Sequence, residues 1–218
     1  MIVDPPGRPG QIIILNGAPR AGKSSIVEVI QETFDGVWVN LGVDVFMQGA
    51  IPRKFLPAIG LRPGGEGPDL EPLIETLYAA LYESIAVHSR LGLNVVVDIG
   101  HHDSCTASRG IFLASCARRL AGLPVLFVGV RCPIEVIMER RNAGQPGREH
   151  AYVKGTAADP VPEPVLRWHR EVHRHGIYDL EVDTSKLTPA ECAMVIQERL
   201  QGGPAPSAFD QLAARLDR

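Results

Sequence analysis

Short apolar runs alternate along the chain with longer stretches in which apolar residues recur at helical spacing. The runs are short and rich in β-branched residues, so they predict buried strands. The predicted strands are 11–16, 37–41, 93–99, 124–130 and 178–182. The helical spacing predicts helices at 23–34, 70–91, 107–120, 133–141 and 188–200. Strands that alternate with helices in this way predict an α/β fold with a parallel sheet covered on both faces.

Two of the predicted helices carry more detailed expectations. In the helix at 70–91, the residues expected along its apolar face are Leu73, Leu77, Leu81, Ile85 and Val87. In the helix at 188–200, Thr188 is the expected N-cap, and Glu191 three residues later would complete a capping box. These expectations fix which faces of the two helices should be buried and where the second one begins.

Stretches rich in glycine and proline separate the predicted elements and are expected to be loops. They cover 1–10, 57–72, 144–164 and 202–206. The elements together predict one domain over residues 1–200, followed by a flexible tail at 201–218. Within the tail, the pattern of Phe209, Leu212, Ala213 and Leu216 predicts a short amphipathic helix that packs on its own domain.

Composition and charge narrow the class of protein. The chain has 45% hydrophobic and 22% charged residues and a net charge of −3, which is typical of a soluble globular protein without a nucleic-acid or membrane surface as partner. No apolar run is long enough to cross a bilayer, and the N-terminus lacks the pattern of a signal peptide, so a cytoplasmic protein is expected. The four cysteines fit no zinc pattern and are expected to be buried thiols. The sequence leaves open whether the chain forms a homo-oligomer.

The strongest chemical signal lies between the first predicted strand and the first predicted helix. The run GAPRAGKS at 17–24 matches the phosphate-binding loop, or P-loop, in full and in the required context. Its backbone N–H groups and the following helix N-terminus suit phosphate oxygens, and a chance glycine-rich turn is the alternative. Lys23 is expected to reach the β- and γ-phosphates of ATP, and Ser24 to ligate Mg²⁺. The expected nucleotide-binding residues are Gly17, Ala18, Pro19, Arg20, Ala21, Gly22, Lys23, Ser24 and Ser25.

Two carboxylates follow predicted strands and are candidates for catalysis. Asp98 comes directly after the strand valines at 95–97 and is expected to hold Mg²⁺, unless it is a helix cap or a loop acid. Asp44 follows the second strand and is the candidate general base that accepts the proton of an attacking hydroxyl. The alternative for Asp44 is an N-cap of a helix that starts at Val45.

Basic residues and histidines suggest further parts of a kinase site. Arg140 and Arg148, with Arg141 between them, surround a Gly/Pro loop, so residues 139–165 are expected to form a small lid whose arginines stabilise phosphoryl charge. A solvated charged face is the alternative. The cluster His101–His102–Asp103 could line an acceptor pocket or lie in a solvated loop, and both readings stay open.

With these motifs, the chain resembles the chloramphenicol phosphotransferase family of P-loop kinases. The residues that carry the resemblance are ILNGAPRAGKSSIV at 14–27, LGVD at 41–44, VVVD at 95–98, VGVRC at 128–132 and YDLEVDTS at 178–185. The resemblance implies a five-stranded parallel sheet in the order 2-3-1-4-5, ATP as the phosphate donor and a hydroxylated small molecule as the acceptor. It also implies Asp44 as the base, Arg140 and Arg148 near the phosphates, and Asp183 and Thr184 near the adenine.

Three functions remain distinct on the sequence. The first is an O-phosphotransferase for chloramphenicol or a similar antibiotic, favoured by the apolar character of the segment 46–69. The second is a kinase of another small metabolite or of a sugar nucleotide, as in zeta-type toxins. The third is a nucleotide-binding regulator that transfers no phosphate and needs no base at Asp44.

Overall fold

A single sheet of five parallel strands forms the centre of the protein. The computed structural model describes residues 7–50, 71–102, 112–144 and 152–217. The strands are β1 (Ile12–Asn16), β2 (Trp38–Asn40), β3 (Asn94–Ile99), β4 (Val125–Arg131) and β5 (Leu180–Asp183). Their order is β2-β3-β1-β4-β5, which confirms the predicted order and places β1 in the middle.

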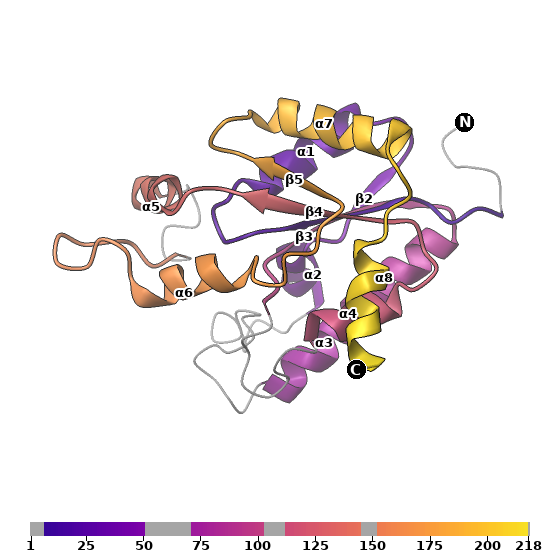
Figure 1. The fold of residues 1–218 in the computed structure, drawn as a ribbon, viewed down its shortest axis with the longest axis horizontal. Helices are drawn as coiled ribbons and strands as arrows, with labels where there is room; N and C mark the ends of the chain where they lie inside the picture. Colours follow the sequence, from indigo (N-terminus) through magenta and orange to yellow (C-terminus); the bar gives the residue numbers. More distant parts are fainter. Residues whose placement is uncertain (1–6, 51–70, 103–111, 145–151, 218) are drawn as a thin grey trace.

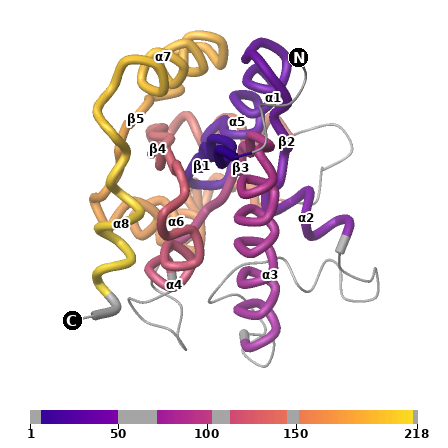
Figure 2. Tube along the Cα trace, turned by 90° about the vertical axis from the view of Figure 1, so that its right-hand side faces the viewer, coloured from indigo at the N-terminus to yellow at the C-terminus, as the bar shows by residue number. Residues whose placement is uncertain are grey.

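Helices cover both faces of the sheet (Figures 1 and 2). On one face lie α1 (Lys23–Thr33) and α7 (Pro189–Gly202). On the other face lie α3 (Glu71–Arg90), α4 (Phe112–Arg119) and α8 (Ala208–Ala213), which continues into the 3-10 helix η3 (Ala214–Asp217). Helix α2 (Val43–Ala50) follows β2, while α5 (Ile134–Ala143) and α6 (Glu163–Glu171) lie at the carboxyl end of the sheet.

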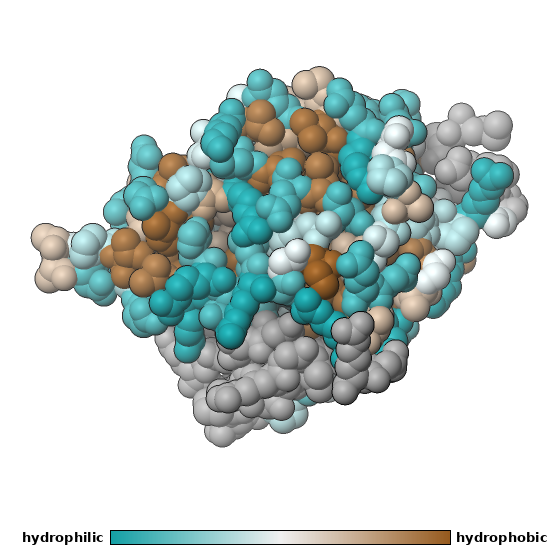
Figure 3. Space-filling view, viewed as in Figure 1, coloured by the Kyte–Doolittle hydropathy of each residue, from teal (hydrophilic) through white to brown (hydrophobic). Residues whose placement is uncertain are grey.

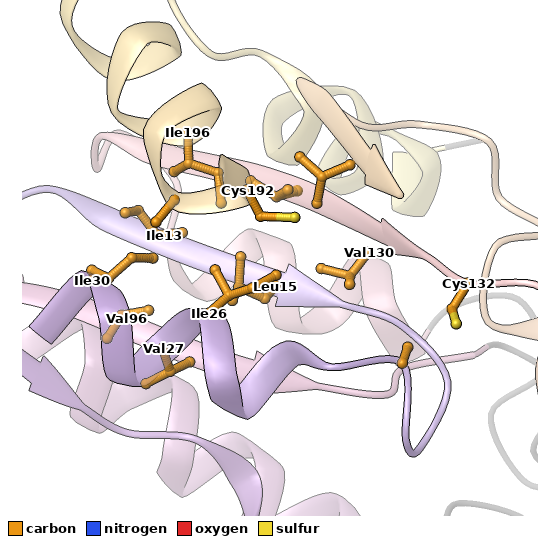
Figure 4. Close-up of a cluster of buried hydrophobic side chains, with 14 of the residues drawn as sticks. Ile13, Leu15, Ile26, Val27, Ile30, Val96, Val130, Cys132, Cys192 and Ile196 are labelled. Carbon is orange, nitrogen blue, oxygen red and sulfur yellow. The ribbon is translucent and has the colours of Figure 1, made fainter. Parts of the chain in front are cut away.

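Each face of the sheet has its own apolar core, because successive side chains of a strand point to opposite faces. Ile13 and Leu15 of β1 pack with Ile26 of α1 and Cys192 of α7 (Figure 4). The neighbouring Ile12 and Ile14 belong to the opposite core, whose larger buried side chains are Tyr82, Phe127 and Phe209. Both cores extend to β1, so the residues that follow this strand are held from two sides.

The apolar face of α3 differs in part from the expected one. The large side chains that α3 buries are those of Ile74, Tyr78, Leu81, Tyr82 and Ile85. The expectation is confirmed for Leu81 and Ile85 and wrong for Leu73 and Val87, which are 39% and 49% exposed. The two tyrosines belong to the core face because their rings are apolar, and the expected face did not include them.

Helix α6 has no counterpart among the predicted elements. Its prolines made the stretch up to residue 164 look like a loop, yet Pro162 is the N-cap and Pro164 lies in the first turn. Proline is tolerated at these positions because the first N–H groups of a helix have no intrahelical partner. The correct signal was the spacing of Val165, Trp168 and Val172, of which Val165 and Val172 are buried.

The C-terminal segment packs on the face that carries α3 and α4. Asp179 Oδ1 accepts hydrogen bonds from the backbone N–H groups of Ser207 and Ala208, at 2.7 and 3.0 Å. Phe209 and Leu212 of α8 are buried in the adjoining core. The capping box at Thr188 and Glu191 is present as predicted. The division into a domain and a flexible tail stays a prediction.

The remaining features of the fold are the polarity of its surface and the state of its cysteines. Hydrophilic residues cover much of the face in Figure 3, and apolar groups gather in the upper part of the view, where α7 lies, and toward the end that carries α5 and α6. No helix within the described ranges is both long and apolar enough to span a membrane. Cys116, Cys132 and Cys192 are free and buried, as expected, and Cys105 lies outside the described residues.

Candidate active site

The P-loop connects β1 to α1 in a conformation that its glycines permit. Gly22 has a φ of +91°, a region that glycine occupies without strain, and α1 begins at the next residue. A side chain at Gly17 would collide with the carbonyl oxygen of Val130, so only glycine fits beside β4. Arg20 also has a positive φ, at +74°. The loop therefore has the tight, left-handed turns that direct backbone N–H groups toward a bound anion.

The Lys23 side chain folds back over this loop. Its Nζ donates hydrogen bonds to the carbonyl oxygens of Gly17 and Ala18, at 2.8 and 3.0 Å. Burial lowers the pKa of Lys23, while the negative charges of Asp98 and Asp44 oppose that shift. The ammonium group thus lies within electrostatic reach of both predicted carboxylates.

Ser24 and Asp98 meet at the start of α1. The Ser24 hydroxyl donates to Asp98 Oδ2 at 2.7 Å, and Asp98 lies within β3, opposite Leu15 of β1. The alternative that Asp98 is a helix cap or a loop acid is therefore wrong. A side chain at Gly42 would collide with Asp98 Oδ1, so this glycine makes room for the carboxylate. A hydroxyl and a carboxylate oxygen at this spacing fit the oxygen ligands that Mg²⁺ takes beside phosphates.

Asp44 lies in the first turn of α2, beside the Ser24–Asp98 pair. The helix begins at Val43, and Phe46 N donates to Gly42 O at 2.9 Å. Asp44 is therefore the second residue of the helix, and the alternative of an N-cap for a helix at Val45 is wrong. Its side chain is exposed, which suits a group that meets a substrate.

Arg140 binds the P-loop and the segment after β5 at once. Its Nη1 donates to Thr184 Oγ1 at 3.1 Å and to Arg20 O at 3.3 Å, and its Nη2 donates to Thr184 O at 2.9 Å. Arg20 Nη2 donates in return to the carbonyl oxygens of Arg140 and Gly144, at 2.6 and 3.1 Å. The P-loop and the end of α5 are thus held together by reciprocal bonds.

The other predicted lid arginines have different positions. Arg141 is buried, donates to Val153 O at 3.2 Å and lies over the Tyr152 ring, 5.4 Å from its centroid. A fully solvated charged face is therefore wrong for Arg140 and Arg141. Arg148 lies outside the described residues, and the lid itself stays a prediction.

Asn16, at the end of β1, connects distant parts of the chain, and no sequence pattern predicted this. Its Nδ2 donates to Val172 O at 3.1 Å and to the Tyr178 hydroxyl at 3.0 Å, and its Oδ1 accepts from His101 N at 2.8 Å. The Tyr178 hydroxyl lies 2.7 Å from His173 Nδ1. A fully buried Asn16 therefore joins three distant segments directly behind the P-loop.

Both histidines of the predicted cluster are buried. The His101 side chain is 0% exposed, and its ring meets that of Tyr78 edge to face with 4.6 Å between centroids. Burial, followed by the nearby His102 and His175, lowers the pKa of His101 to about 3, so the ring is neutral. The solvated-loop alternative is wrong for His101 and His102, and Asp103 lies outside the described residues.

Helix α6 closes the carboxyl end of the sheet, and its contacts come from two consecutive residues. Trp168 Nε1 donates to Gly100 O, just after β3, at 3.1 Å. His169 Nε2 lies 3.0 Å from Cys132 O, just after β4. These residues were missed because the helix itself was missed. The tryptophan and histidine within the Val165–Val172 spacing could have indicated them.

The chain is similar in sequence to a curated relative and in fold to solved kinases. The relative named "Putative O-phosphotransferase Rv2636", from Mycobacterium tuberculosis, is 27% identical over 95% of this chain and 89% of its own. The APS kinase CysC of Mycobacterium tuberculosis, solved in complex with AMPPNP and APS, has a TM-score of 0.56 and 15% identity over 90% of this chain and 100% of that chain. The shikimate kinase of Aquifex aeolicus has a TM-score of 0.50 and 16% identity over 88% of this chain and 97% of that chain. The two structures show that this is the fold of P-loop kinases.

A family match extends over nearly all of the described elements. The chain matches the family described as "Chloramphenicol phosphotransferase-like protein" over residues 10–201. That range runs from two residues before β1 almost to the end of α7 and contains the P-loop, Asp44 and Asp98. The protein belongs to the chloramphenicol phosphotransferase-like family and is a small-molecule kinase.

Proposed function

We propose that the protein transfers the γ-phosphate of ATP to a hydroxyl group of a small molecule, with chloramphenicol or a similar antibiotic as acceptor. The observation that supports this most strongly is the meeting of Ser24 and Asp98 at 2.7 Å beside Lys23. A P-loop lysine, a hydroxyl and a carboxylate are the groups that hold the phosphates and metal of a nucleotide in such kinases.

On the nucleotide side, residues of the protein bind the phosphates and supply positive charge to them. Lys23 leaves the Gly17 and Ala18 carbonyls and binds oxygens of the β- and γ-phosphates, for which the P-loop N–H groups provide the remaining donors. Ser24 and Asp98 would hold Mg²⁺, which supplies positive charge to the phosphate oxygens when it is bound. Arg140 adds positive charge at the P-loop, and Arg148 is assigned to the lid by the resemblance alone.

The acceptor side needs a base. Asp44 accepts the proton of the acceptor hydroxyl, whose oxygen forms a bond to the γ-phosphorus. The bond from that phosphorus to the β–γ bridging oxygen breaks, and ADP leaves with the electron pair. The exposed first turn of α2 places Asp44 where a hydroxyl group can approach it from solvent.

An antibiotic acceptor is supported by the family and by the apolar residues near Asp44. Phe46 and Met47 follow Asp44 on α2, and Met47 is buried in the core that adjoins this helix. The rest of the predicted acceptor segment, up to residue 69, lies outside the described residues. Phosphorylation of chloramphenicol would imply a role in resistance, within the cytoplasm where the antibiotic acts.

Substitution of Asp44 tests the proposal. Asp44→Asn keeps the shape of the side chain and removes the base, so acceptor-dependent ADP release should fall by roughly 10²- to 10⁴-fold. Nucleotide binding, measured by calorimetry with ADP, should remain. Asp35→Asn, at an exposed carboxylate beyond α1, is the matched control and should keep full activity.

The outcomes separate the three functions. Full turnover by Asp44→Asn would refute the base assignment. Turnover with shikimate or a sugar nucleotide, but not with antibiotics, would keep the kinase and change its acceptor. ATP binding without transfer to any hydroxylated compound would favour a nucleotide-binding regulator.

A further inference from the structure

We infer that Trp168 forms an aromatic wall of the acceptor site and selects acceptors that carry an aromatic ring. This inference rests on the proposed function and adds a specificity-determining residue to it. Trp168 belongs to α6, about 120 residues beyond Asp44 in the chain, and no motif of the sequence connects the two.

A short series of contacts places the indole ring beside the reacting groups. Trp168 Nε1 donates to Gly100 O at 3.1 Å. A Cβ at Gly100 would lie 3.3 Å from Trp168 Nε1 on one side and 3.3 Å from Gly17 O on the other. Gly17 O is the atom that accepts the hydrogen bond of Lys23 Nζ at 2.8 Å. The ring is therefore one glycine residue away from the carbonyl that holds the P-loop lysine.

The position of Gly100 also assigns this ring to the acceptor side rather than to the base of the nucleotide. Gly100 follows β3 two residues after Asp98, and β3 lies between β1 and β2. Asp44 follows β2, so the candidate base and Gly100 come from neighbouring strands. The segment assigned to the adenine, Asp183 and Thr184, follows β5 on the opposite side of β1.

The surroundings of Trp168 fix the ring as a rigid surface. His102 is buried and meets the indole edge to face, with 5.2 Å between the ring centroids. Trp168 itself is only partly buried. His169 anchors the same turn of α6 to Cys132 O at 3.0 Å. A ring held by a hydrogen bond and an aromatic neighbour loses little conformational entropy when a flat ligand packs on it.

The chemistry of this wall favours a particular class of acceptor. An indole ring is neutral, and aromatic rings prefer to pack on it face to face with an offset or edge to face. Its single donor, Nε1, is already used by Gly100 O. The expected acceptor is therefore a hydroxylated molecule with an aromatic ring, such as chloramphenicol, rather than a polyhydroxylated acid such as shikimate.

Two substitutions at Trp168 separate a binding wall from a structural role. Trp168→Phe keeps a ring and loses the bond to Gly100 O, whereas Trp168→Leu loses both. The probe is chloramphenicol, titrated by calorimetry into protein saturated with Mg-ADP. The Kd should rise by about 3- to 10-fold more in Trp168→Leu than in Trp168→Phe, because ring packing is lost only in the former. The Kd for ADP should be the same in both.

The second tryptophan of the chain provides the control. Trp38 is buried on β2 against Phe34, with 5.6 Å between the ring centroids, and the sequence has two tryptophans. Trp38→Phe should leave chloramphenicol binding unchanged. In that variant Trp168 is the sole source of tryptophan emission, which should change on addition of chloramphenicol. In Trp168→Phe the remaining emission, from Trp38, should not change.

Each outcome has a definite meaning. Equal weakening in Trp168→Phe and Trp168→Leu would overturn the wall and assign Trp168 to positioning through Gly100 O. Unchanged affinity in both, or a wild-type protein that binds no aromatic alcohol, would also overturn it.

Phosphate transfer is assayed separately, so that the two proposals can fail independently. Binding through Trp168 without transfer would keep the wall and refute the proposed function. Transfer to shikimate without binding of chloramphenicol would overturn the wall and keep the kinase, with its acceptor changed.

Discussion

The two halves of the candidate site are built in different ways. The proposed phosphate side comes from one contiguous segment, residues 17–24, whose turns and folded-back lysine form within the segment itself. The proposed acceptor side depends instead on Trp168, which bonds to Gly100, and on Asn16, which bonds to His101 and Tyr178; these partners meet only in the folded chain. Local backbone geometry is therefore sufficient for a phosphate site, whereas a pocket for a particular acceptor depends on long-range packing.

Removal of the Lys23 ammonium should break the phosphate side alone and have the largest effect. Lys23→Met keeps the length of the side chain but removes the charge that stabilises the transferring phosphoryl group. The value of kcat/KM should fall by about 10³-fold. The free energy of unfolding, measured by urea denaturation, should be unchanged or higher, because a buried charge has been removed. A variant with full activity would show that the phosphate side does not depend on this lysine.

A methyl group at Gly42 should disturb the Ser24–Asp98 pair, which we propose to hold Mg²⁺, while it leaves the proposed acceptor side intact. In Gly42→Ala the new Cβ displaces the Asp98 carboxylate from Ser24, so turnover should fall by about 10- to 100-fold and require more Mg²⁺. Gly49→Ala in α2, the helix that follows Gly42, is the control, since its Cβ would meet nothing within 4 Å. Equal activity of the two variants would contradict the role of Asp98.

Truncation of Asn16 should loosen the connection between the halves. Asn16→Ala removes the partner of Val172 O, the Tyr178 hydroxyl and His101 N in a buried site, so the free energy of unfolding should fall by about 2–3 kcal/mol. Urea denaturation measures this change. Asn142→Ala, at an exposed asparagine near the end of α5, should cost less than about 1 kcal/mol. A similar loss of unfolding free energy in both variants would show that Asn16 contributes no more to stability than an exposed asparagine.

Acid should lower the free energy of unfolding gradually, through the buried His101 and the partly buried His175. Burial lowers the pKa of His101 to about 3, and that of His175 to about 4. Between these values and about 6.5 the unfolded chain binds protons that the folded protein excludes. The free energy of unfolding is therefore highest above about pH 7. It should fall on acidification, by up to about 1.4 kcal/mol per pH unit for His101 and by less for the partly exposed His175. Urea titrations from pH 7.5 to 5.5 should show a shallower slope in His101→Gln, and parallel slopes would contradict this.

The difference between the halves also explains what the sequence could predict. The P-loop, the five strands and their acidic ends follow from local patterns, and the family resemblance adds their order. The contacts of Trp168 and Asn16 could not be predicted, because their partners lie 68 and 156 residues away in the chain. The prolines of α6 hid the helix that carries Trp168, since proline at a helix start looks the same in sequence as proline in a loop.

The most direct test of the account is phosphate transfer itself. The purified protein would be incubated with Mg-ATP and chloramphenicol, followed by other hydroxylated antibiotics, and each acceptor would be analysed by mass spectrometry. The account predicts that chloramphenicol or a related aromatic acceptor gains the mass of one phosphoryl group, with one ADP released for each product. ATP binding without a phosphorylated product from any hydroxylated compound would contradict it.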